Sequence, residues 1–289
     1  MGAVEREIVD RIRAFYNEFP FPGYEVDDYY SVASLYDRAS PYVKMLDRQM
    51  PSGLRVLDVG CGTGQLAALL SIANREVLGI DLSERSIALA NSLKERLDLP
   101  NVTFVQGNLF DVHLPEDSFD YVLCNGVLHN THDPYRGFVI LCSGVKPGGY
   151  IIIGLYNTYG RFFTKVRGLL FRLFGTTVGD RLTKLDYFMR RQDLPDVQKR
   201  AWFFDQYHNP YETAHTIEEV LAWLRANEID YVNGIPKIRL FQPFSPDERL
   251  FEGEPKVGGW IEHTLVQLGW VLTTQKEGGY FLSIGRRRR

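Results

Sequence analysis

The region from Leu54 to Gly154 alternates short apolar runs with longer segments of helix-forming residues. The pattern predicts strands at 54–59, 76–80, 102–106, 119–124 and 148–154, and helices at 65–73, 84–97 and 134–143. Strands that alternate with helices in this way form βαβ units and a parallel sheet. The crossovers of such a sheet are right-handed, and its ligand site lies at the carboxyl ends of the strands.

The first 45 residues predict a helix followed by an aromatic stretch. Apolar residues from Val4 to Phe15 fall on one face of a helix over 4–16. Two prolines and a glycine within 19–24 end that helix, and Pro41 is well placed to begin another. Tyrosines crowd the stretch between them, so it is either an aromatic clasp packed on the surface or a lid that closes over a ligand.

The last quarter of the chain returns to regular elements. It predicts a helix at 217–227, a strand at 229–236, a loop at 237–256, a helix at 260–272 and a closing strand near 279–284. The sequence shows neither internal repeats nor a low-complexity tract.

A glycine-rich turn follows the first strand of the alternating region. Residues 56–59 are apolar or β-branched apart from one acid, and Gly60, Gly62 and Gly64 come directly after them. Glycine lets the backbone approach a ligand closely, and the helix that follows points free N–H groups at the same place. Gln65 stands where a dinucleotide fingerprint has Gly or Ala, and no Lys-Ser or Lys-Thr of a P-loop follows.

A carboxylate follows the second predicted strand. Asp81 stands 21 residues after Gly60, at the same edge of the predicted sheet. A carboxylate in this position accepts two hydrogen bonds from a ribose diol. Helix capping is the alternative interpretation, although Ser83 is the better N-cap residue.

Composition narrows the class of protein. The 289 residues are 45% hydrophobic and 24% charged, with a formal net charge of −3, so bulk electrostatics gives no reason to expect a nucleic-acid groove. Cys61, Cys124 and Cys142 have no metal-ligand spacing and read as small buried residues in a reducing compartment. The N-terminus has no secretory apolar core, and no apolar run approaches the ~20 residues of a spanning helix. We expect a cytoplasmic protein without a bound metal.

Five motifs in a fixed order resemble those of the class I S-adenosylmethionine-dependent methyltransferases. They are Asp58-x-Gly60-x-Gly62-x-Gly64, Asp81, Gly107-Asn108, Val127-Leu128-His129 and Lys146-Pro147-Gly148-Gly149. The resemblance covers about residues 45–155 and is greatest to the branch that methylates small molecules such as quinone and sterol precursors. It departs from the family at Asn108, where Asp is usual, and at Asn130, where a second His is common.

The resemblance implies S-adenosylmethionine as the cofactor. The glycines would flank its methionine and ribose portions, Asp81 would bind the ribose hydroxyls, and Asn108 with Leu109 would serve the adenine. The amide oxygen of Asn108 can accept the same N–H bond that an Asp would. Asn125 would lie near the sulfonium and the amino group. The expected cofactor-binding residues are Asp58, Gly60, Cys61, Gly62, Gly64, Asp81, Leu82, Asn108, Leu109 and Asn125.

The fold implied is α/β: a Rossmann-like, seven-stranded, mostly parallel sheet with helices on both faces and an antiparallel last strand. We expect an N-terminal helical and aromatic lid at 1–45 and a cofactor-binding core at 46–155. An inserted cap with the substrate region would follow at 156–216. The rest of the core sheet, with an inserted loop and helix, would occupy 217–289.

Segment 161–174 has the length of a helix and sets basic residues among bulky apolar ones. One interpretation is an inserted helix packed over the cleft, with its basic side chains directed outward. The other is an interfacial helix that makes a peripheral membrane contact or grips a lipid-like substrate.

Segment 202–211 combines an acid, amides, phenols and imidazole among aromatic residues, as substrate pockets do. Methyl transfer mainly requires alignment and desolvation, and it needs a proton acceptor only for an OH, an NH or an acidic carbon. The candidate proton acceptors are His129 and His132 after the fourth strand, and His208 in the aromatic segment. The candidate substrate residues are Tyr16, Tyr24, His129, Tyr156 and Tyr207.

The leading hypothesis is a methyltransferase acting on a small, apolar or aromatic metabolite. A protein or tRNA methyltransferase is one alternative, disfavoured by the acidic net charge and by Asn125-Gly126-Val127-Leu128 in place of an Asn-Pro-Pro-Tyr tetrad. A non-catalytic, cofactor-binding partner subunit is another, disfavoured by the intact Asp81 and glycines. The substrate, the acceptor atom and the oligomeric state stay open at this stage.

Overall fold

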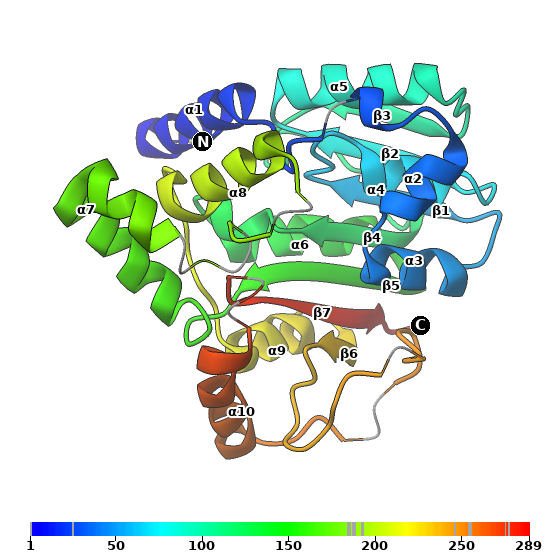
Figure 1. Ribbon diagram of the computed structural model, residues 1–289. Helices are drawn as coiled ribbons and strands as arrows, with labels where there is room; N and C mark the ends of the chain where they lie inside the picture. Colours follow the sequence, from blue (N-terminus) through cyan, green and yellow to red (C-terminus); the bar gives the residue numbers. More distant parts are fainter. Residues whose placement is uncertain are drawn as a thin grey trace.

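The computed structural model describes residues 2–24, 26–183, 186, 189–191, 194–245, 247–253, 256–274, 276 and 278–289. A seven-stranded sheet in the order β3-β2-β1-β4-β5-β7-β6 runs through the molecule (Figure 1). Its strands are β1 (Arg55–Val59), β2 (Glu76–Asp81), β3 (Val102–Gln106), β4 (Phe119–Asn125), β5 (Val145–Tyr156), β6 (Ile229–Ile235) and β7 (Tyr280–Arg287).

The first five strands are parallel, and β7 runs antiparallel to both β5 and β6. This confirms the predicted fold class, including the antiparallel last strand. The central strands are buried along almost their whole length, because helices cover both faces of a parallel sheet. Strands buried on both faces have continuous apolar runs instead of alternating ones, and the sequence of these strands shows such runs.

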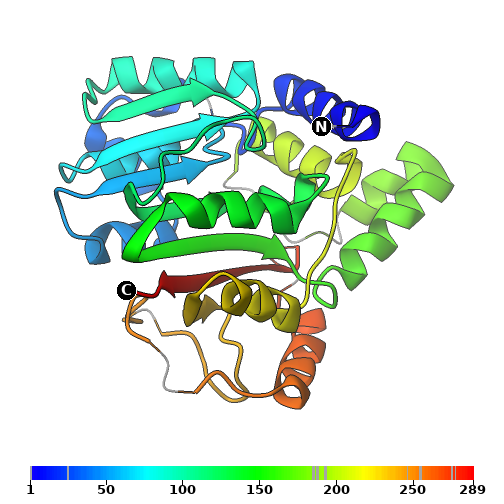
Figure 2. The same ribbon diagram turned by 180° about the vertical axis from the view of Figure 1, so that it is seen from behind.

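Two hydrophobic cores lie on the two faces of the sheet. One includes Leu46 of α3 (Pro41–Gln49) and Leu70 of α4 (Gln65–Ser71). The other includes Phe138 of α6 (Pro134–Gly144), Leu221 of α9 (Ile217–Ala226) and Trp270 of α10 (Trp260–Thr273). Figures 1 and 2 show α6 and α9 on the face opposite α2 to α4. The helices are α1 (Ala3–Glu18), α2 (Val32–Arg38), α3 (Pro41–Gln49), α4 (Gln65–Ser71), α5 (Glu84–Arg96), α6 (Pro134–Gly144), α7 (Phe162–Thr183), α8 (Asp196–His208), α9 (Ile217–Ala226) and α10 (Trp260–Thr273).

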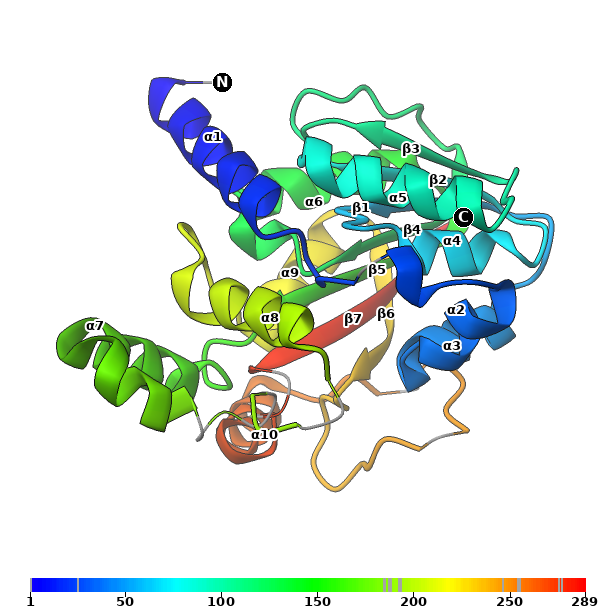
Figure 3. The same cartoon turned by 45° about the horizontal axis from the view of Figure 1, so that its top comes forward.

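The N-terminal residues are part of this architecture. Helix α1 lies against α5, where the Ser83 hydroxyl bonds the Asn17 side chain at 2.8 Å. Phe19, just after α1, stacks on Phe204 of α8 with ring centroids 3.9 Å apart. Leu35 of α2 belongs to the same core as α3 and α4. Helix α1 therefore lies near the carboxyl ends of the strands, and α2 and α3 lie beside α4 over one face of the sheet (Figure 3). The role of segment 1–45 as a lid stays a prediction.

Two elements differ from the expectations. The sequence predicted no helix at α8, because its aromatic and amide residues match no simple amphipathic pattern. Helix α7 begins at Phe162 and continues to Thr183, beyond the expected 161–174. Part of the expected cap at 156–216 lies outside the described residues.

Arg161 corrects the interpretation of the basic residues before α7. Its side chain is 1% exposed and forms an ion pair with Glu212, rather than pointing outward. The guanidinium also lies over the Tyr156 ring, 3.7 Å from its centroid. A buried charge needs a partner of opposite sign, and Glu212 supplies it. Among the helices that the structure describes, none is both long and apolar enough to cross a bilayer.

Candidate active site

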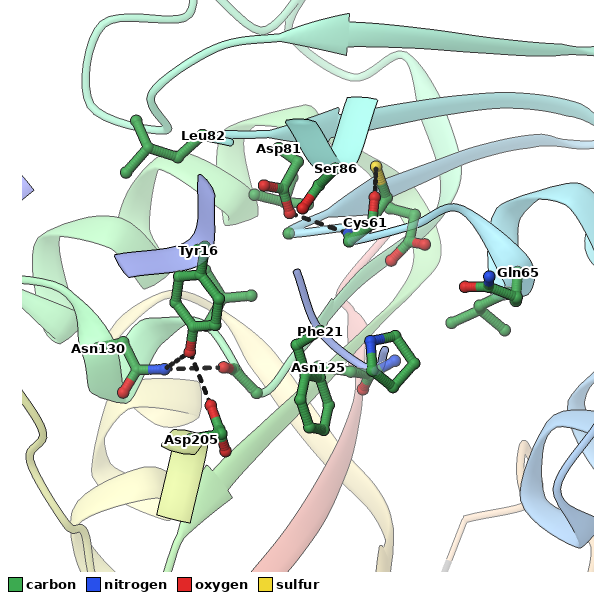
Figure 4. Close-up of a pocket in the computed structure, with 18 of the residues that line it drawn as sticks. Tyr16, Phe21, Cys61, Gln65, Asp81, Leu82, Ser86, Asn125, Asn130 and Asp205 are labelled. Carbon is green, nitrogen blue, oxygen red and sulfur yellow. Dashed lines mark hydrogen bonds between the residues drawn. The ribbon is translucent and has the colours of Figure 1, made fainter. Parts of the chain in front are cut away.

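A cavity of about 790 Å³ lies at the carboxyl ends of the parallel strands. Its floor is the turn after β1 with the ends of β2 and β4, and residues of α1, α2, α3 and α8 form its walls (Figure 4). The volume is within the range of small-molecule sites, which is about 300–1,000 Å³. The predicted residues that line it are Tyr16, Tyr24, Asp58, Gly60, Cys61, Gly62, Asp81, Leu82, Asn108, Leu109, Asn125 and Tyr156.

The glycine turn allows another segment of the chain to approach it closely. Gly62 has a φ of +54°, and a Cβ atom there would lie 2.5 Å from the carbonyl oxygen of Phe21. At Gly60, with a φ of +72°, a Cβ would collide with Val127 at 2.0 Å. Only glycine fits both the left-handed backbone and the available space. The turn is therefore enclosed by the segment after α1 and by the residues after β4.

Asp81 holds the glycine turn in place. Its Oδ2 accepts the Gly62 N–H at 2.9 Å, and its Oδ1 accepts the Ser83 N–H at 2.8 Å. Ser83 is the N-cap of α5 and accepts the Ser86 N–H, so capping does not depend on Asp81. Each carboxylate oxygen can accept two hydrogen bonds. Asp81 therefore keeps one acceptor position on each oxygen for a ligand in the cavity.

Asp58 is a buried carboxylate with spare bonding capacity. It is 2% exposed, and its Oδ2 has no hydrogen-bond partner among the described residues. Burial, reinforced by the nearby charge of Asp81, raises the pKa of Asp58 to about 7. A buried anion in this state is stabilised by a cation, such as an ammonium group, bound in the cavity.

The Asn108 side chain bonds to two residues that follow it in the chain. Its Oδ1 accepts the Phe110 N–H at 3.2 Å and its Nδ2 donates to Asp111 Oδ2 at 2.9 Å. This local turn fixes the chain so that Leu109 lies buried at the cavity wall. The proposed adenine contact of the Asn108 side chain stays a prediction.

At the other end of the cavity, residues from four elements meet around one carboxylate. Tyr16 at the end of α1 donates its hydroxyl hydrogen to Asp205 Oδ1 of α8 at 2.8 Å (Figure 4). Tyr156 at the end of β5 donates to Asp205 Oδ2 at 3.1 Å. The Asn130 amide donates to the Tyr16 oxygen at 3.0 Å. Tyr16, Asn130, Tyr156 and Asp205, here called the Asp205 cluster, all line the cavity.

The candidate histidines occupy other positions. His129 is buried against the Tyr156 ring, and burial, with the charge of Arg161, holds its pKa well below the usual range. His208 is exposed at the end of α8, where it contacts Phe203 and Phe204. Neither lines the cavity, so their proposed proton-acceptor role has no support from its geometry.

The remaining candidate residues lie partly inside and partly outside the lining of the cavity. His132 does line the cavity and packs on Phe110, with ring centroids 4.2 Å apart. Tyr207 is buried behind the wall, where it donates to Asp186 Oδ2 at 2.6 Å. Gly64 is the N-cap of α4 and is outside the lining.

The sequence interpretation identified the 202–211 segment but selected different members of it. Trp202 and Asp205 line the cavity, whereas Tyr207 and His208 do not. The two lining residues are three positions apart, which is the spacing of one helix face. A helical interpretation of this segment would have grouped Asp205 with Trp202 on one face and put Tyr207 on the opposite face.

Comparisons with known proteins point to a methyltransferase. Residues 51–185 match the methyltransferase domain family. An uncharacterized protein of Synechococcus sp. is 26% identical over 92% of this chain and 70% of its own length. A demethylmenaquinone methyltransferase of Oceanobacillus iheyensis is 31% identical over 42% of this chain, and the match spans 56% of that protein.

Solved structures share the fold at low sequence identity. PKMT2 from Rickettsia typhi in complex with AdoHcy aligns with a TM-score of 0.58 at 16% identity, over 87% of this chain and 54% of that chain. An S-adenosylmethionine-dependent methyltransferase from Mesorhizobium loti aligns with a TM-score of 0.52 at 18% identity, over 87% of this chain and all of that chain.

Fold, glycine turn and sequence match together define an α/β methyltransferase domain. The fold and the sequence matches support a class I S-adenosylmethionine-dependent methyltransferase, and S-adenosylmethionine is the cofactor of this class. When bound, this cofactor supplies a methyl group on a positively charged sulfur. The cavity fits it, because the orphaned Asp58 oxygen can receive an ammonium group and Asp81 can receive hydroxyl groups.

Proposed function

We propose that this protein transfers the methyl group of S-adenosylmethionine to a small molecule with an apolar or aromatic body. The main support for this proposal is that a single cavity joins the glycine turn to an aromatic pocket. The same cavity that contains the glycine turn is walled by aromatic side chains of other segments. They are Phe21, Tyr24, Tyr29, Tyr42, Trp202 and Tyr280.

The residues at the glycine turn would hold the cofactor. Asp81 would bind the ribose hydroxyls, and the ionised Asp58 would pair with the amino group. Gly60 and Gly62 would allow the backbone to approach the methionine portion. Aligning two reactants in an enclosed site provides most of the catalysis that methyl transfer needs.

The name of the relatives favours a small-molecule acceptor. Several matching proteins are demethylmenaquinone methyltransferases, although each match covers only part of their length. A tRNA or protein acceptor has less support. The basic residues Arg161 and Arg167 bond to Glu212 and Tyr207 within the molecule, so they do not form a stripe for a polyanion.

The experiment that tests the proposed function combines purified protein, methyl-labelled S-adenosylmethionine and an extract of the source cell. Label is counted in the lipid, small-molecule, protein and RNA fractions. We expect label in the lipid or small-molecule fraction, lost in Asp81→Ala and retained in Asp230→Ala, an exposed carboxylate on β6. Label in protein or RNA, or an Asp81→Ala variant that is fully active, would overturn the proposal.

We also propose that α7 makes a peripheral contact with a lipid surface. Phe162, Val166, Leu169 and Leu173 repeat at intervals of four, three and four residues and are 39–65% exposed. The exposed Lys165 lies beside this stripe, and the opposite side of α7 packs on α8 through Phe171. An apolar stripe with a neighbouring cation is typical of interfacial helices, which prefer anionic lipid.

Co-sedimentation with vesicles tests this contact. The variant Leu169→Asp with Leu173→Asp should lose binding to anionic phosphatidylglycerol vesicles, whereas wild-type protein should bind them better than phosphatidylcholine vesicles. The matched control is Leu265→Asp with Leu268→Asp on α10, another exposed apolar stripe, whose helix contains no Lys or Arg. Equal binding by both variants and wild-type protein would contradict a role of α7.

A further inference from the structure

Asp205 is a buried carboxylate at the opposite end of the cavity from Asp58. It is 7% exposed, and two phenols and one amide donate hydrogen bonds to it. Its Oδ2 accepts from Tyr156 and Gln206, whereas its Oδ1 accepts from Tyr16. Since each carboxylate oxygen can accept two hydrogen bonds, Oδ1 keeps one acceptor position.

The hydroxyl hydrogens of the cluster are already directed to Asp205. The Tyr16 oxygen accepts the amides of Asn130 at 3.0 Å and Asn209 at 3.1 Å, so its hydrogen is free to point to the carboxylate. The Tyr156 oxygen likewise accepts the Gln206 amide at 2.5 Å. An ionised carboxylate only accepts hydrogen bonds. A ligand group that binds Asp205 must therefore be a donor, O–H or N–H.

Charged groups surround Asp205 on several sides. Arg161 lies behind Tyr156 and is paired with Glu212, while Tyr16 and Tyr156 face the carboxylate directly. Burial raises the pKa of Asp205, and the hydrogen bonds of both tyrosines and the charge of Arg161 oppose that rise. His129, held neutral beyond Tyr156, and Asp81, on the cofactor side of Tyr16, complete the surroundings.

We propose that the Asp205 cluster is the acceptor end of the active site. It binds the acceptor through an O–H or N–H group, and Asp205 takes that proton during methyl transfer. The acceptor class is thus a phenol, alcohol or amine with an apolar body, which the aromatic walls enclose. This inference rests on the proposed methyltransferase function.

The step balances with the residues present. A lone pair of the acceptor oxygen or nitrogen forms the bond to the methyl carbon, while the sulfur–methyl bond breaks and its electron pair stays on sulfur. The acceptor hydrogen passes to Asp205, which becomes a carboxylic acid. The products are the methylated acceptor and S-adenosylhomocysteine, and Asp205 then returns its proton to water.

The first test measures binding and needs no turnover. Phenol and toluene are similar in size, but only phenol donates a hydrogen bond. Calorimetry of each with protein saturated in S-adenosylhomocysteine should show tighter binding of phenol by wild-type protein, although toluene is the more apolar probe. In Asp205→Asn the ratio of the two affinities should fall about tenfold, because a charged acceptor makes the stronger bond. Tighter binding of toluene by wild-type protein would overturn the proposal.

The second test follows methyl transfer to the extract fraction that wild-type protein labels. Asp205→Asn should reduce the initial rate at pH 7 by about 100-fold or more, the usual effect of losing a proton acceptor. The control Asp186→Asn removes another buried carboxylate that accepts a tyrosine hydrogen bond but does not line the cavity. Its rate should stay within about threefold of wild type. Such a change in the activation free energy is well under the roughly 1.4 kcal/mol of a tenfold effect.

The pH profile distinguishes an Asp205 that accepts a proton from an Asp205 that only holds α1 in place through Tyr16. At saturating S-adenosylmethionine, where the titration of Asp58 does not limit cofactor binding, the wild-type rate should fall as the pH drops through the pKa of Asp205. This acidic limb should be absent in Asp205→Asn. Tyr16→Phe removes a bond to the charged carboxylate, so the limb should move to higher pH. If Asp205→Asn does not fold, the shift of the limb in Tyr16→Phe still tests the role of Asp205. Tyr150→Phe, which removes a hydroxyl elsewhere, is the control and should not shift it. An unchanged limb would overturn the proposal.

The two levels of the hypothesis fail differently. If wild-type protein binds no S-adenosylhomocysteine or labels no small molecule, the proposed function is wrong. If wild-type protein labels a small molecule and Asp205→Asn is equally active with the same pH profile, the methyltransferase function stands and the role of Asp205 is wrong.

Discussion

The two ends of the cavity are built in different ways. The cofactor end comes from consecutive short turns after β1, β2 and β3, so its residues follow one another along the chain. The acceptor end collects Tyr16, Asn130, Tyr156 and Asp205 from segments up to 189 positions apart. A site of local turns is encoded in short motifs, whereas a site of distant segments exists only after folding. This contrast predicts that variants at the two ends have separable effects.

The largest separable effect is expected at Asp81. Asp81→Ala removes both the anchor of the glycine turn and the proposed acceptor for the ribose, so S-adenosylhomocysteine affinity should fall about 100-fold, close to 2.7 kcal/mol. Asp205→Asn should leave that affinity within about twofold, because Asp205 lies at the other end. Calorimetry of both variants measures these affinities. Loss of cofactor binding in Asp205→Asn would contradict the separation of the two ends.

Gly62→Ala should have the next largest effect. The new Cβ would meet the Phe21 carbonyl at 2.5 Å in a left-handed conformation, which costs a non-glycine residue about 1–2 kcal/mol. We expect about tenfold weaker S-adenosylhomocysteine binding and a lower melting temperature, measured by calorimetry and thermal unfolding. Gly253→Ala, where a Cβ has nothing within 4 Å, is the control. A wild-type-like Gly62→Ala would mean that the segment after α1 moves away at no cost.

Asp58 should make cofactor binding depend on pH. Its pKa of about 7 means that it is protonated below neutrality, and only the ionised form attracts an ammonium group. S-adenosylhomocysteine affinity should fall below pH 7, by up to about tenfold per pH unit. Calorimetry between pH 5.5 and 8.5 checks this, and Asp58→Asn should flatten the dependence.

The raised pKa of Asp58 also determines how the free energy of unfolding of the ligand-free protein changes with pH. Because the folded-state pKa is raised, the folded protein binds more protons than the unfolded chain between about pH 4 and 7. The contribution of Asp58 to the free energy of unfolding therefore decreases as the pH rises through this window. A stability profile of Asp58→Asn that decreases as steeply as wild type would contradict the assignment.

The smallest effect is expected at Asn17, the neighbour of Tyr16, which contacts the start of α5 and does not line the cavity. Its side chain accepts the Ser83 hydroxyl hydrogen at 2.8 Å, at the buried N-cap of α5. Asn17→Ala should weaken S-adenosylhomocysteine binding by no more than about threefold, since a neutral hydrogen bond contributes about 1 kcal/mol. It should leave the pH profile of methyl transfer unchanged, in contrast to Tyr16→Phe. A profile shifted by Asn17→Ala would indicate that α1 acts as one unit.

Much of the fold followed from local patterns. The strand and helix limits of the alternating region were predicted to within a few residues, because buried parallel strands have continuous apolar runs. Helix α8 was not predicted, because Gln198, Asp205 and Gln206 are buried polar residues that interrupt an amphipathic pattern. The partners of Asp205 and Gln206 are Tyr16 of α1, Tyr156 of β5 and Arg161 before α7, and the sequence around α8 does not reveal them.

The sequence by itself determined the α/β class, the glycine turn and the order of the polar residues that follow the strands. These features depend on backbone conformations and periodicities within a few residues, and such short-range preferences can be read directly. Only the tertiary structure decided that Arg161 is buried against Glu212 and that Asp205, rather than Tyr207 or His208, reaches the cavity. The physical reason is that burial and hydrogen bonding of a polar side chain depend on partners far away in the chain, and folding alone brings those partners together.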